Sequence, residues 1–258
     1  MAEFERTFDN VAENYDKIRP EYPLELYEDI FRYKPVDAES RALEIGIGTG
    51  KATLPVLERN CKISAIEPGE KLADITLEKY KGYKNFSLHR QTLQDFDSLL
   101  ESYDLIYSAT AFHWIPEEYG YKRVYQLLKK GGAFARFAYH AGQDEGRKEL
   151  SSELQLLYQT YMKRNAPPEK SFEETARKIA EIADNYGFSD IEYKIYHMTK
   201  DFSADEYMEL LRTYPDHMKL EQSDREKLFS GIHTAIMKSG GVITVYYTVD
   251  LQMARKKL

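Results

Sequence analysis

The run from Glu44 to Gly50 reads E-I-G-I-G-T-G. One acidic residue, Glu44, is followed by glycine at every second position. An apolar stretch at residues 42–45 leads into the run, and a helix-compatible segment begins at Lys51. Closely spaced glycines let a backbone turn sharply off a buried strand, and they let a ligand approach main-chain N–H groups that a Cβ atom would cover. The run therefore predicts a nucleoside-binding strand, turn and helix.

The spacing of these glycines decides which nucleoside ligand they fit. A dinucleotide-binding turn has the pattern G-x-G-x-x-G, but counting from Gly46 its third glycine would fall at Lys51. A phosphate-binding loop has the pattern G-x-x-x-x-G-K-[ST], and Gly50 followed by Lys51 matches only its end. Ile45 and Ala52 stand where that loop needs its first glycine and its magnesium-binding hydroxyl. The sequence argues against both phosphate-binding patterns.

A second acidic residue, Glu67, closes the next apolar run at residues 63–66. This run has the character of the neighbouring strand. A carboxylate about 20 residues past the glycines, at the carboxyl end of the second strand, is where an α/β sheet binds both hydroxyls of a ribose. Glu67 is therefore predicted to bind a ribose.

Together these residues resemble the class I S-adenosylmethionine-dependent methyltransferases, whose first motif is acidic-x-Gly-x-Gly-x-Gly. The resemblance implies S-adenosyl-L-methionine as the cofactor, with the glycine turn beside its methionine part and the second acidic residue on its ribose. The cofactor-binding residues implied at these two motifs are Glu44, Gly46, Gly48, Thr49, Gly50, Glu67 and Pro68.

Strand and helix patterns alternate from residue 41 to 138, as a parallel sheet requires. Two more strands follow a more helical region, in which three capping-box pairs predict helix starts: Ser171 with Glu174, Ser203 with Glu206, and Ser223 with Glu226. The predicted strands are residues 41–45, 62–67, 85–89, 104–109, 133–139, 191–198 and 242–251. The family fold implied is α/β, a doubly wound, Rossmann-like, seven-stranded and mostly parallel sheet with an antiparallel last strand.

The resemblance also implies a division of the chain. Residues 1–34 are expected to form an N-terminal helical lid segment, and residues 35–258 a methyltransferase domain. Helical insertions at about 143–170 and 203–238 are expected to cover the substrate side of the sheet, where family members differ most.

Further family positions match one by one. Thr92 and Leu93 follow the third strand and are implied adenine contacts, while Ser108, Ala109 and Phe112 follow the fourth strand, beside the sulfonium. The segment A-F-H-W at residues 111–114 resembles a small-molecule subgroup that includes the trans-aconitate type. The leading helix of that subgroup, which folds over the cofactor, is matched by Phe8, Ala12, Tyr15, Arg19, Pro20 and Pro23.

Catalytic and substrate residues carry a weaker signal. His113 is the candidate general base, although it could instead hydrogen-bond the substrate or simply pack near Trp114, the only tryptophan. Trp114, Tyr214 and His217 are candidate substrate contacts. The alternative for the last two is a solvent-exposed turn, because they follow a helix at the break made by Pro215.

Composition limits the partners. The net charge is −7, there is no apolar run near 18 residues, and Cys61 is the only cysteine. We expect a cytoplasmic, disulfide-free protein that binds neither membrane nor nucleic acid. No H-x-x-x-H or C-x-x-C pair indicates a metal. The expected partner is a small-molecule methyl acceptor, and subgroup resemblance favours one with a carboxylate, with Arg19 as its cationic partner; the acceptor's identity and the oligomeric state stay open.

Two other functions fit the same motifs. The chain could bind S-adenosylmethionine without catalysing transfer, or it could move a different group, such as an aminopropyl group, on the same fold. The family that transfers aminopropyl groups carries acidic substrate-site motifs after the fourth strand, and none is visible here. Intact cofactor motifs and an intact leading segment favour an enzyme over a binding protein.

Overall fold

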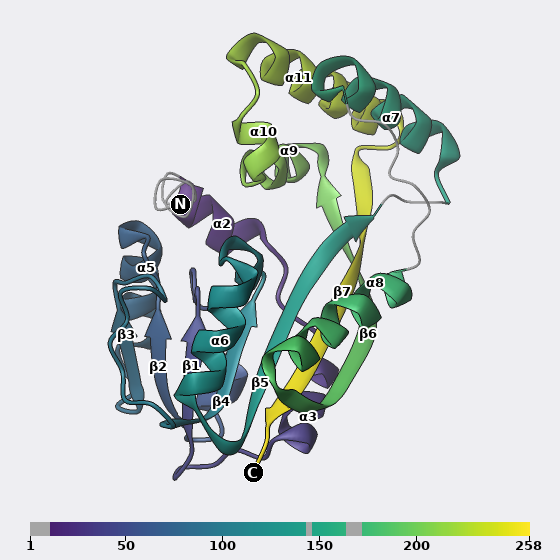
Figure 1. The fold of residues 1–258 in the computed structure, drawn as a ribbon. Helices are drawn as coiled ribbons and strands as arrows, with labels where there is room; N and C mark the ends of the chain where they lie inside the picture. The colour runs from purple at the N-terminus through teal and green to yellow at the C-terminus, as the bar shows by residue number, and fades with distance from the viewer. Residues whose placement is uncertain (1–10, 143–145, 164–171) are drawn as a thin grey trace.

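A seven-stranded sheet with the order β3-β2-β1-β4-β5-β7-β6 forms the centre of the computed structural model, which describes residues 11–142, 146–163 and 172–258. Every strand is parallel to its neighbours except β7, which is antiparallel to both β5 and β6. The predicted doubly wound, mostly parallel fold is confirmed (Figure 1). The strands are β1 Arg41–Ile45, β2 Lys62–Ile66, β3 Phe86–His89, β4 Tyr103–Ala109, β5 Leu128–Gly142, β6 Phe188–Ser203 and β7 Val242–Lys256.

β1 lies between β2 and β4, and its side chains are buried on both faces of the sheet. Ala42 packs into a core with the helices α3 (Leu24–Tyr33), α4 (Leu54–Leu57) and α5 (Glu70–Tyr80). Leu43 packs on the opposite side with α6 (Glu117–Leu127) and the short helix η3 (Ile182–Tyr186). Two apolar layers explain why the run at 42–45 is continuously apolar apart from one glutamate.

The last three strands are longer than predicted. β5 pairs with β7 from Ala133↔Arg255 to Gly142↔Tyr246, and β7 pairs with β6 over most of its length. β5 and β6 extend past the parallel strands to residues 142 and 203, and β7 extends at its other end to Lys256. Polar residues weaken the apolar signal at each of these ends. Antiparallel pairing supplies the missing backbone hydrogen bonds, so these strands continue beyond the point at which hydrophobicity alone would end them.

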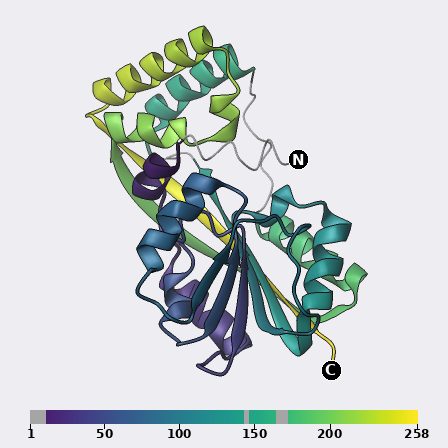
Figure 2. The ribbon, with the colours of Figure 1, turned by 90° about the vertical axis from the view of Figure 1, so that its left-hand side faces the viewer.

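A helical layer lies beyond the carboxyl ends of the sheet, above the outer halves of β5, β6 and β7 (Figures 1 and 2). It contains α7 (Lys148–Met162), α9 (Ala204–Arg212), α10 (Pro215–Met218) and α11 (Gln222–Lys238). α7 packs along α11, where a Cβ on Gly231 would lie 2.7 Å from the Leu157 side chain. α8 (Phe172–Glu181) instead lies against β6 and β7.

Helix starts agree with the sequence in part. Ser203 caps α9 with Glu206 in a complete capping box, as predicted. Ser223 does not cap α11, because that helix begins at Gln222 with Glu221 at its N-cap, two residues before the predicted cap, so this prediction is wrong. Ser171 lies outside the described residues. α4 begins at Leu54 rather than near Lys51, because the glycine turn continues into a further turn before the helix.

The N-terminal segment enters as α2 (Ala12–Ile18), which lies above the sheet between α5 and α9 (Figure 1). Phe8, from the predicted leader motif, lies outside the described residues. Lys79 of α5 forms an ion pair with Asp16, and Asn14 donates to the Glu209 carbonyl of α9. Within the described ranges, no helix combines the length and apolar character needed to cross a lipid bilayer.

Ser203→Ala is expected to destabilise the protein by about 1 kcal/mol, because it removes the hydroxyl that accepts from the Glu206 amide at the start of α9. Ser223→Ala is the matched control, since Ser223 lies inside the first turn of α11 and alanine favours a helix interior. Urea unfolding of both variants provides the measurement. An equal loss in the two would show that the capping box does not stabilise α9.

Candidate functional site

A cavity of about 500 Å³ opens at the carboxyl ends of β1, β2, β4 and β5, between the sheet and the segments α2 and α10. This is the edge at which parallel α/β sheets bind ligands. Most of the residues predicted from sequence line it. They are Tyr15, Arg19, Gly46, Gly48, Thr49, Glu67, Pro68, Thr92, Leu93, Ser108, Ala109, Phe112, His113, Trp114 and Tyr214.

Three predicted residues do not line the cavity: Glu44, Gly50 and His217. His217 is 3% exposed, with Nδ1 bonded to Asp216 and Nε2 bonded to the Tyr158 hydroxyl. The exposed turn considered for this residue is therefore wrong, because the imidazole is enclosed by the helical layer. The His217 ring is tilted against the Tyr214 ring, with their centroids 5.6 Å apart, so it lies behind a residue that does reach the cavity.

The glycine turn after β1 has a backbone that only glycine adopts easily. Gly46, Gly48 and Gly50 have φ angles of 68°, 59° and 77°. A Cβ on Gly46 would lie 2.5 Å from the Ala111 Cβ, so the turn after β1 touches the turn after β4. A Cβ on Gly48 would meet no atom within 4 Å, because this glycine faces the cavity.

Helix α5 holds this turn through its carbonyl oxygens. The carbonyls of residues 48–50 accept, in order, from Thr76 Oγ1 at 2.7 Å, Lys79 Nζ at 2.8 Å and the Tyr80 hydroxyl at 2.6 Å. Three consecutive carbonyls anchored on one helix leave the turn little freedom. The turn is thus preorganised for a ligand.

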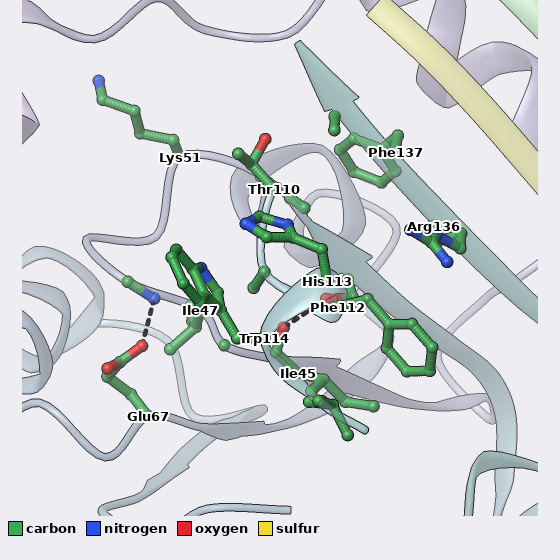
Figure 3. Close-up of a pocket in the computed structure, with 18 of the residues that line it drawn as sticks. Ile45, Ile47, Lys51, Glu67, Thr110, Phe112, His113, Trp114, Arg136 and Phe137 are labelled. Carbon is green, nitrogen blue, oxygen red and sulfur yellow. Dashed lines mark hydrogen bonds between the residues drawn. The ribbon is translucent and has the colours of Figure 1, made fainter. Parts of the chain in front are cut away.

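Glu67 extends from the end of β2 toward the same turn. Its Oε2 accepts from the Gly48 N–H at 2.9 Å (Figure 3). Its Oε1 accepts from the Gly69 N–H at 2.9 Å. These two bonds orient the carboxylate, which is 5% exposed, at the cavity wall. Each carboxylate oxygen carries two lone pairs, so one backbone donor does not exhaust its capacity.

Glu44 lies beneath the turn rather than in the cavity. It is 1% exposed, and its Oε2 accepts from both Thr53 Oγ1 and the Tyr107 hydroxyl at 2.7 Å. Burial raises the pKa of this carboxyl to about 7; the two hydrogen bonds oppose that rise, and the charge of Glu67 adds to it. The charge beneath the turn therefore changes near neutral pH.

The turn after β4 carries a strained residue. Thr110 has a φ of 51°, which is unfavourable for a β-branched side chain. Its N–H donates to the Phe137 carbonyl at 2.7 Å, and its hydroxyl lies 2.6 Å from that of Tyr22. Ser108 Oγ donates to the Ile45 carbonyl at 2.9 Å, which ties β4 to β1 (Figure 3). The hydrogen bonds to Phe137 and Tyr22 hold Thr110 in this strained conformation.

The short helix η2 (Phe112–Trp114) follows, and in Figure 3 its His113 and Trp114 lie between Ile47 and Arg136. The ring centroids of His113 and Trp114 are 4.7 Å apart. Burial lowers the pKa of His113, and the positive charge of Arg136 lowers it further. His113 is therefore a neutral imidazole at physiological pH.

Arg19 is a buried cation at the cavity wall, 6% exposed. Its guanidinium donates to Thr213 Oγ1 and to the Thr213 carbonyl at 2.8 Å, and to the Tyr139 hydroxyl at 3.3 Å. It also lies 4.2 Å from the Tyr214 ring centroid and 5.1 Å from that of Tyr15. Burial alone would lower the pKa of Arg19, but the surrounding tyrosines raise it. In the part of the chain that the structure describes, no carboxylate forms an ion pair with it.

Sequence reasoning missed one wall, formed by β5 and β7. Arg136 and His140 of β5 line the cavity beside Asp250 and Gln252 of β7. His140 Nε2 lies 2.9 Å from Asp250 Oδ1, and Gln252 Nε2 donates to Oδ2 at 2.6 Å. The available signal was the alternation of polar and aromatic residues through β5, which predicts that positions 136 and 140 share a face.

Asp250 is a buried anion in this wall, 6% exposed. Burial alone would raise its pKa, but the bonds to His140 and Gln252 and the charge of Arg136 hold it below the usual range. Among the residues that the structure describes, no group of three or more His, Cys, Asp or Glu side chains is placed to hold a metal ion.

Comparison with known proteins places this site among methyltransferases. A family model described as a methyltransferase domain matches residues 42–132, from β1 into β5. An uncharacterized methyltransferase of Schizosaccharomyces pombe is 26% identical over 234 residues, covering 90% of this chain and 87% of that protein. An uncharacterized methyltransferase of Bacillus cereus is 31% identical over 180 residues, covering 62% of this chain and 84% of that protein.

Solved structures share the fold. A protein of Anaeromyxobacter dehalogenans assigned as a type II methyltransferase superposes with a TM-score of 0.67 at 19% identity, covering 93% of this chain and 98% of that one. Phosphoethanolamine N-methyltransferase 2 of Haemonchus contortus, in complex with phosphomonomethylethanolamine and S-adenosylhomocysteine, superposes with a TM-score of 0.57 at 19% identity. That alignment covers 98% of this chain and 60% of the other.

Glu44→Gln is expected to flatten the pH dependence of stability. Because folding raises the pKa of Glu44 from 4.5 to about 7, its protonated form stabilises the folded state fully below pH 4.5, and this contribution is lost as the pH rises to about 7. The wild type should therefore lose on the order of 3 kcal/mol more than the variant between pH 4.5 and 8, at about 1.4 kcal/mol per pKa unit. Urea unfolding across this range measures it; parallel curves would contradict the pKa shift.

Proposed function

Because the chain belongs to the S-adenosylmethionine-dependent methyltransferases, we propose that it transfers the methyl group of S-adenosyl-L-methionine to a small-molecule acceptor by in-line displacement. The observation that carries this proposal is a single cavity that runs from the glycine turn and Glu67 to the wall formed by β5 and β7. A volume of about 500 Å³ is in the range of small-molecule sites and suits a cofactor with a small acceptor beside it.

The described residues fit this cofactor. Gly48 leaves open space beside the turn for its methionine part, and the oriented carboxylate of Glu67 is suited to a ribose diol. Arg19, a buried cation with no carboxylate partner in the described ranges, is suited to the methionine carboxylate. We assign Thr92 and Leu93, together with Pro68, to the adenine end.

The other predicted residues take supporting places in this proposal. Ser108, Ala109 and Phe112 border the methyl-bearing sulfur, with Tyr15 and Thr49 closing the methionine side. Glu44 and Gly50 act from beneath the turn, by charge and by backbone shape. His113, Trp114 and Tyr214 face the acceptor, and His217 holds Tyr214 from behind.

We propose an acceptor that carries a carboxylate, as the resemblance of residues 111–114 to the trans-aconitate subgroup implies. Arg136, which lines the cavity, takes the role of its cationic partner in place of Arg19, because Arg19 is assigned here to the methionine carboxylate. The phosphoethanolamine N-methyltransferase with the same fold also acts on a small molecule, which supports the size of the acceptor rather than its chemistry.

Residues 1–34 are proposed as a lid over a methyltransferase domain at 35–258, with the helical insertions at 143–170 and 203–238 shaping the acceptor side. Within this arrangement α2 joins the glycine-turn side to the helical layer through Asp16 and Asn14. A bound sulfonium supplies an electrophilic methyl group, so the protein mainly aligns the acceptor and keeps water out.

Methyl transfer to extracted metabolites, followed with cofactor labelled in its methyl group, tests the function and identifies the acceptor. Transfer to a small molecule supports the proposal. Cofactor binding without any transfer would instead support the binding-protein alternative, and loss of the aminopropyl group from decarboxylated cofactor would support the other transfer reaction.

Glu67→Ala is expected to weaken S-adenosylhomocysteine binding about ten- to a hundredfold, because charge-assisted hydrogen bonds contribute about 1.5–3 kcal/mol each. Methylthioadenosine, which keeps the ribose but lacks the amino-acid part, should lose the same factor. Calorimetry on the folded variant measures both affinities. As a control of specificity, S-adenosylhomocysteine should raise the melting temperature of the wild type and NAD should not. Unchanged affinity in the variant would remove Glu67 from the site.

Arg19→Gln should give the opposite pattern. If the guanidinium binds the methionine carboxylate, affinity for S-adenosylhomocysteine falls about tenfold or more while affinity for methylthioadenosine is unchanged. The methylthioadenosine result also reports that the variant keeps its site. Equal weakening of both ligands would assign Arg19 a structural role.

Amides of residues 11–19 should exchange more slowly when S-adenosylhomocysteine is bound, as a closing lid requires.

A further inference from the structure

His140 and Asp250 form a hydrogen-bonded pair on the acceptor side of the cavity. Asp250 is enclosed and His140 is half-exposed, with side chains 8% and 43% exposed. The pair is set by strand register: Ala138 pairs with Asp250 and His140 with Thr248, so the two side chains are diagonal neighbours on adjacent strands. The ring of Phe172, at the start of α8, lies 5.6 Å from the imidazole of His140.

Geometry assigns the imidazole tautomer. Asp250 Oδ2 accepts from Gln252 and Oδ1 lies 2.9 Å from His140 Nε2. Asp250 is ionised at neutral pH and cannot donate, so Nε2 must carry the hydrogen of this bond. The lone pair of the neutral ring is therefore on Nδ1. No described residue hydrogen-bonds to Nδ1, so it can accept a proton from a molecule in the cavity.

The two cavity histidines differ in what lies beside them. His113 is buried near the cation Arg136, which disfavours an imidazolium at that position. His140 is bonded to a carboxylate, which stabilises the imidazolium that forms when the ring takes a proton. His113 and His140 both line the cavity.

We propose that His140, oriented by Asp250, is the general base for the acceptor, and that the methyl-accepting atom is a hydroxyl oxygen or an amine nitrogen that loses its proton. This inference rests on the proposed function and names the chemical class of its accepting group. A carboxylate on the same acceptor would serve recognition, because an ionised carboxylate needs no base.

In the proposed transfer, each bond that forms is matched by a bond that breaks. Nδ1 of His140 takes the proton from the acceptor O–H or N–H as a lone pair of that oxygen or nitrogen forms the bond to the methyl carbon. The carbon–sulfur bond breaks and its electron pair stays on sulfur, which leaves S-adenosylhomocysteine. The imidazolium is stabilised by Asp250 and then returns its proton to solvent.

Imidazole nitrogen NMR tests the tautomer without turnover. With S-adenosylhomocysteine bound, His140 should show a protonated Nε2 and an unprotonated Nδ1. Asp250→Asn should abolish this preference, since the amide can either donate or accept. His197, an exposed histidine on β6 outside the cavity, is the matched control and should be unaffected by Asp250→Asn. A protonated Nδ1 in the wild type would overturn the proposal.

Methyl-transfer activity tests the role of His140 as the general base. The probes are methyl-labelled cofactor with catechol, ethanolamine and citrate, together with any acceptor found in the extract. His140→Gln should lower kcat about a hundredfold or more for hydroxyl or amine acceptors while leaving S-adenosylhomocysteine affinity unchanged, since general bases contribute about 10²–10⁴-fold. His197→Gln should match the wild type.

The outcomes separate the two proposals. Transfer to a carboxylate alone, at a rate that His140→Gln does not change, would overturn the assignment of His140 but support the methyltransferase function. If no probe accepts a methyl group, the tautomer measurement decides the assignment by itself. Failure of the wild type to bind S-adenosylhomocysteine would overturn the proposed function itself.

Discussion

The close approach of two turns at the sheet edge determines the shape of the whole site. Gly46, after β1, leaves no room for a side chain against Ala111, after β4, and this contact brings the two neighbouring strand ends together. Ser108 adds a hydrogen bond from β4 to the last carbonyl of β1. Thr110 accepts an unfavourable φ so that the chain can leave β4 beside the glycine turn instead of covering it. The turns after β1 and β4 pack against each other at the floor of the cavity, so the space above them stays open.

Charge is distributed unevenly around this cavity. The glycine-turn side has Glu67, oriented by two backbone amides, with Glu44 buried beneath and near its midpoint of titration at neutral pH. Arg19 supplies a cation on the neighbouring wall, enclosed by tyrosine rings. A ligand that carries separated charges of both signs, such as an amino acid joined to a nucleoside, fits this arrangement better than a polyphosphate. The same conclusion follows from the glycine spacing, by an independent physical route.

The parallel half of the sheet was predictable from sequence, and the antiparallel half was less so. Buried parallel strands are short apolar runs bounded by glycine or acidic residues, and the run at 42–45 and Glu67 are clear examples. The parts of β5 and β7 that lie beyond the predicted ranges, such as residues 140–142 and 252–256, have no such signal, because polar side chains interrupt the apolar pattern there and partner choice depends on register. His140 and Asp250 are 110 residues apart, and only the pairing of β5 with β7 places them together. His217 was predicted either to contact the substrate or to lie in an exposed turn, but the helical layer encloses it behind Tyr214.

Parallel and antiparallel strands therefore contribute to the cavity in different ways. Parallel strands end at one edge, which collects backbone N–H groups, a ribose-binding carboxylate and close-packed turns in one place. An antiparallel strand runs past that edge in the opposite direction, so it can present side chains to the cavity from the middle of its length rather than from a loop. Asp250 and Gln252 are such residues, held in a ladder that pairs on both sides. Groups positioned by strand register are more rigid than groups on loops, as a residue that orients a catalytic base requires.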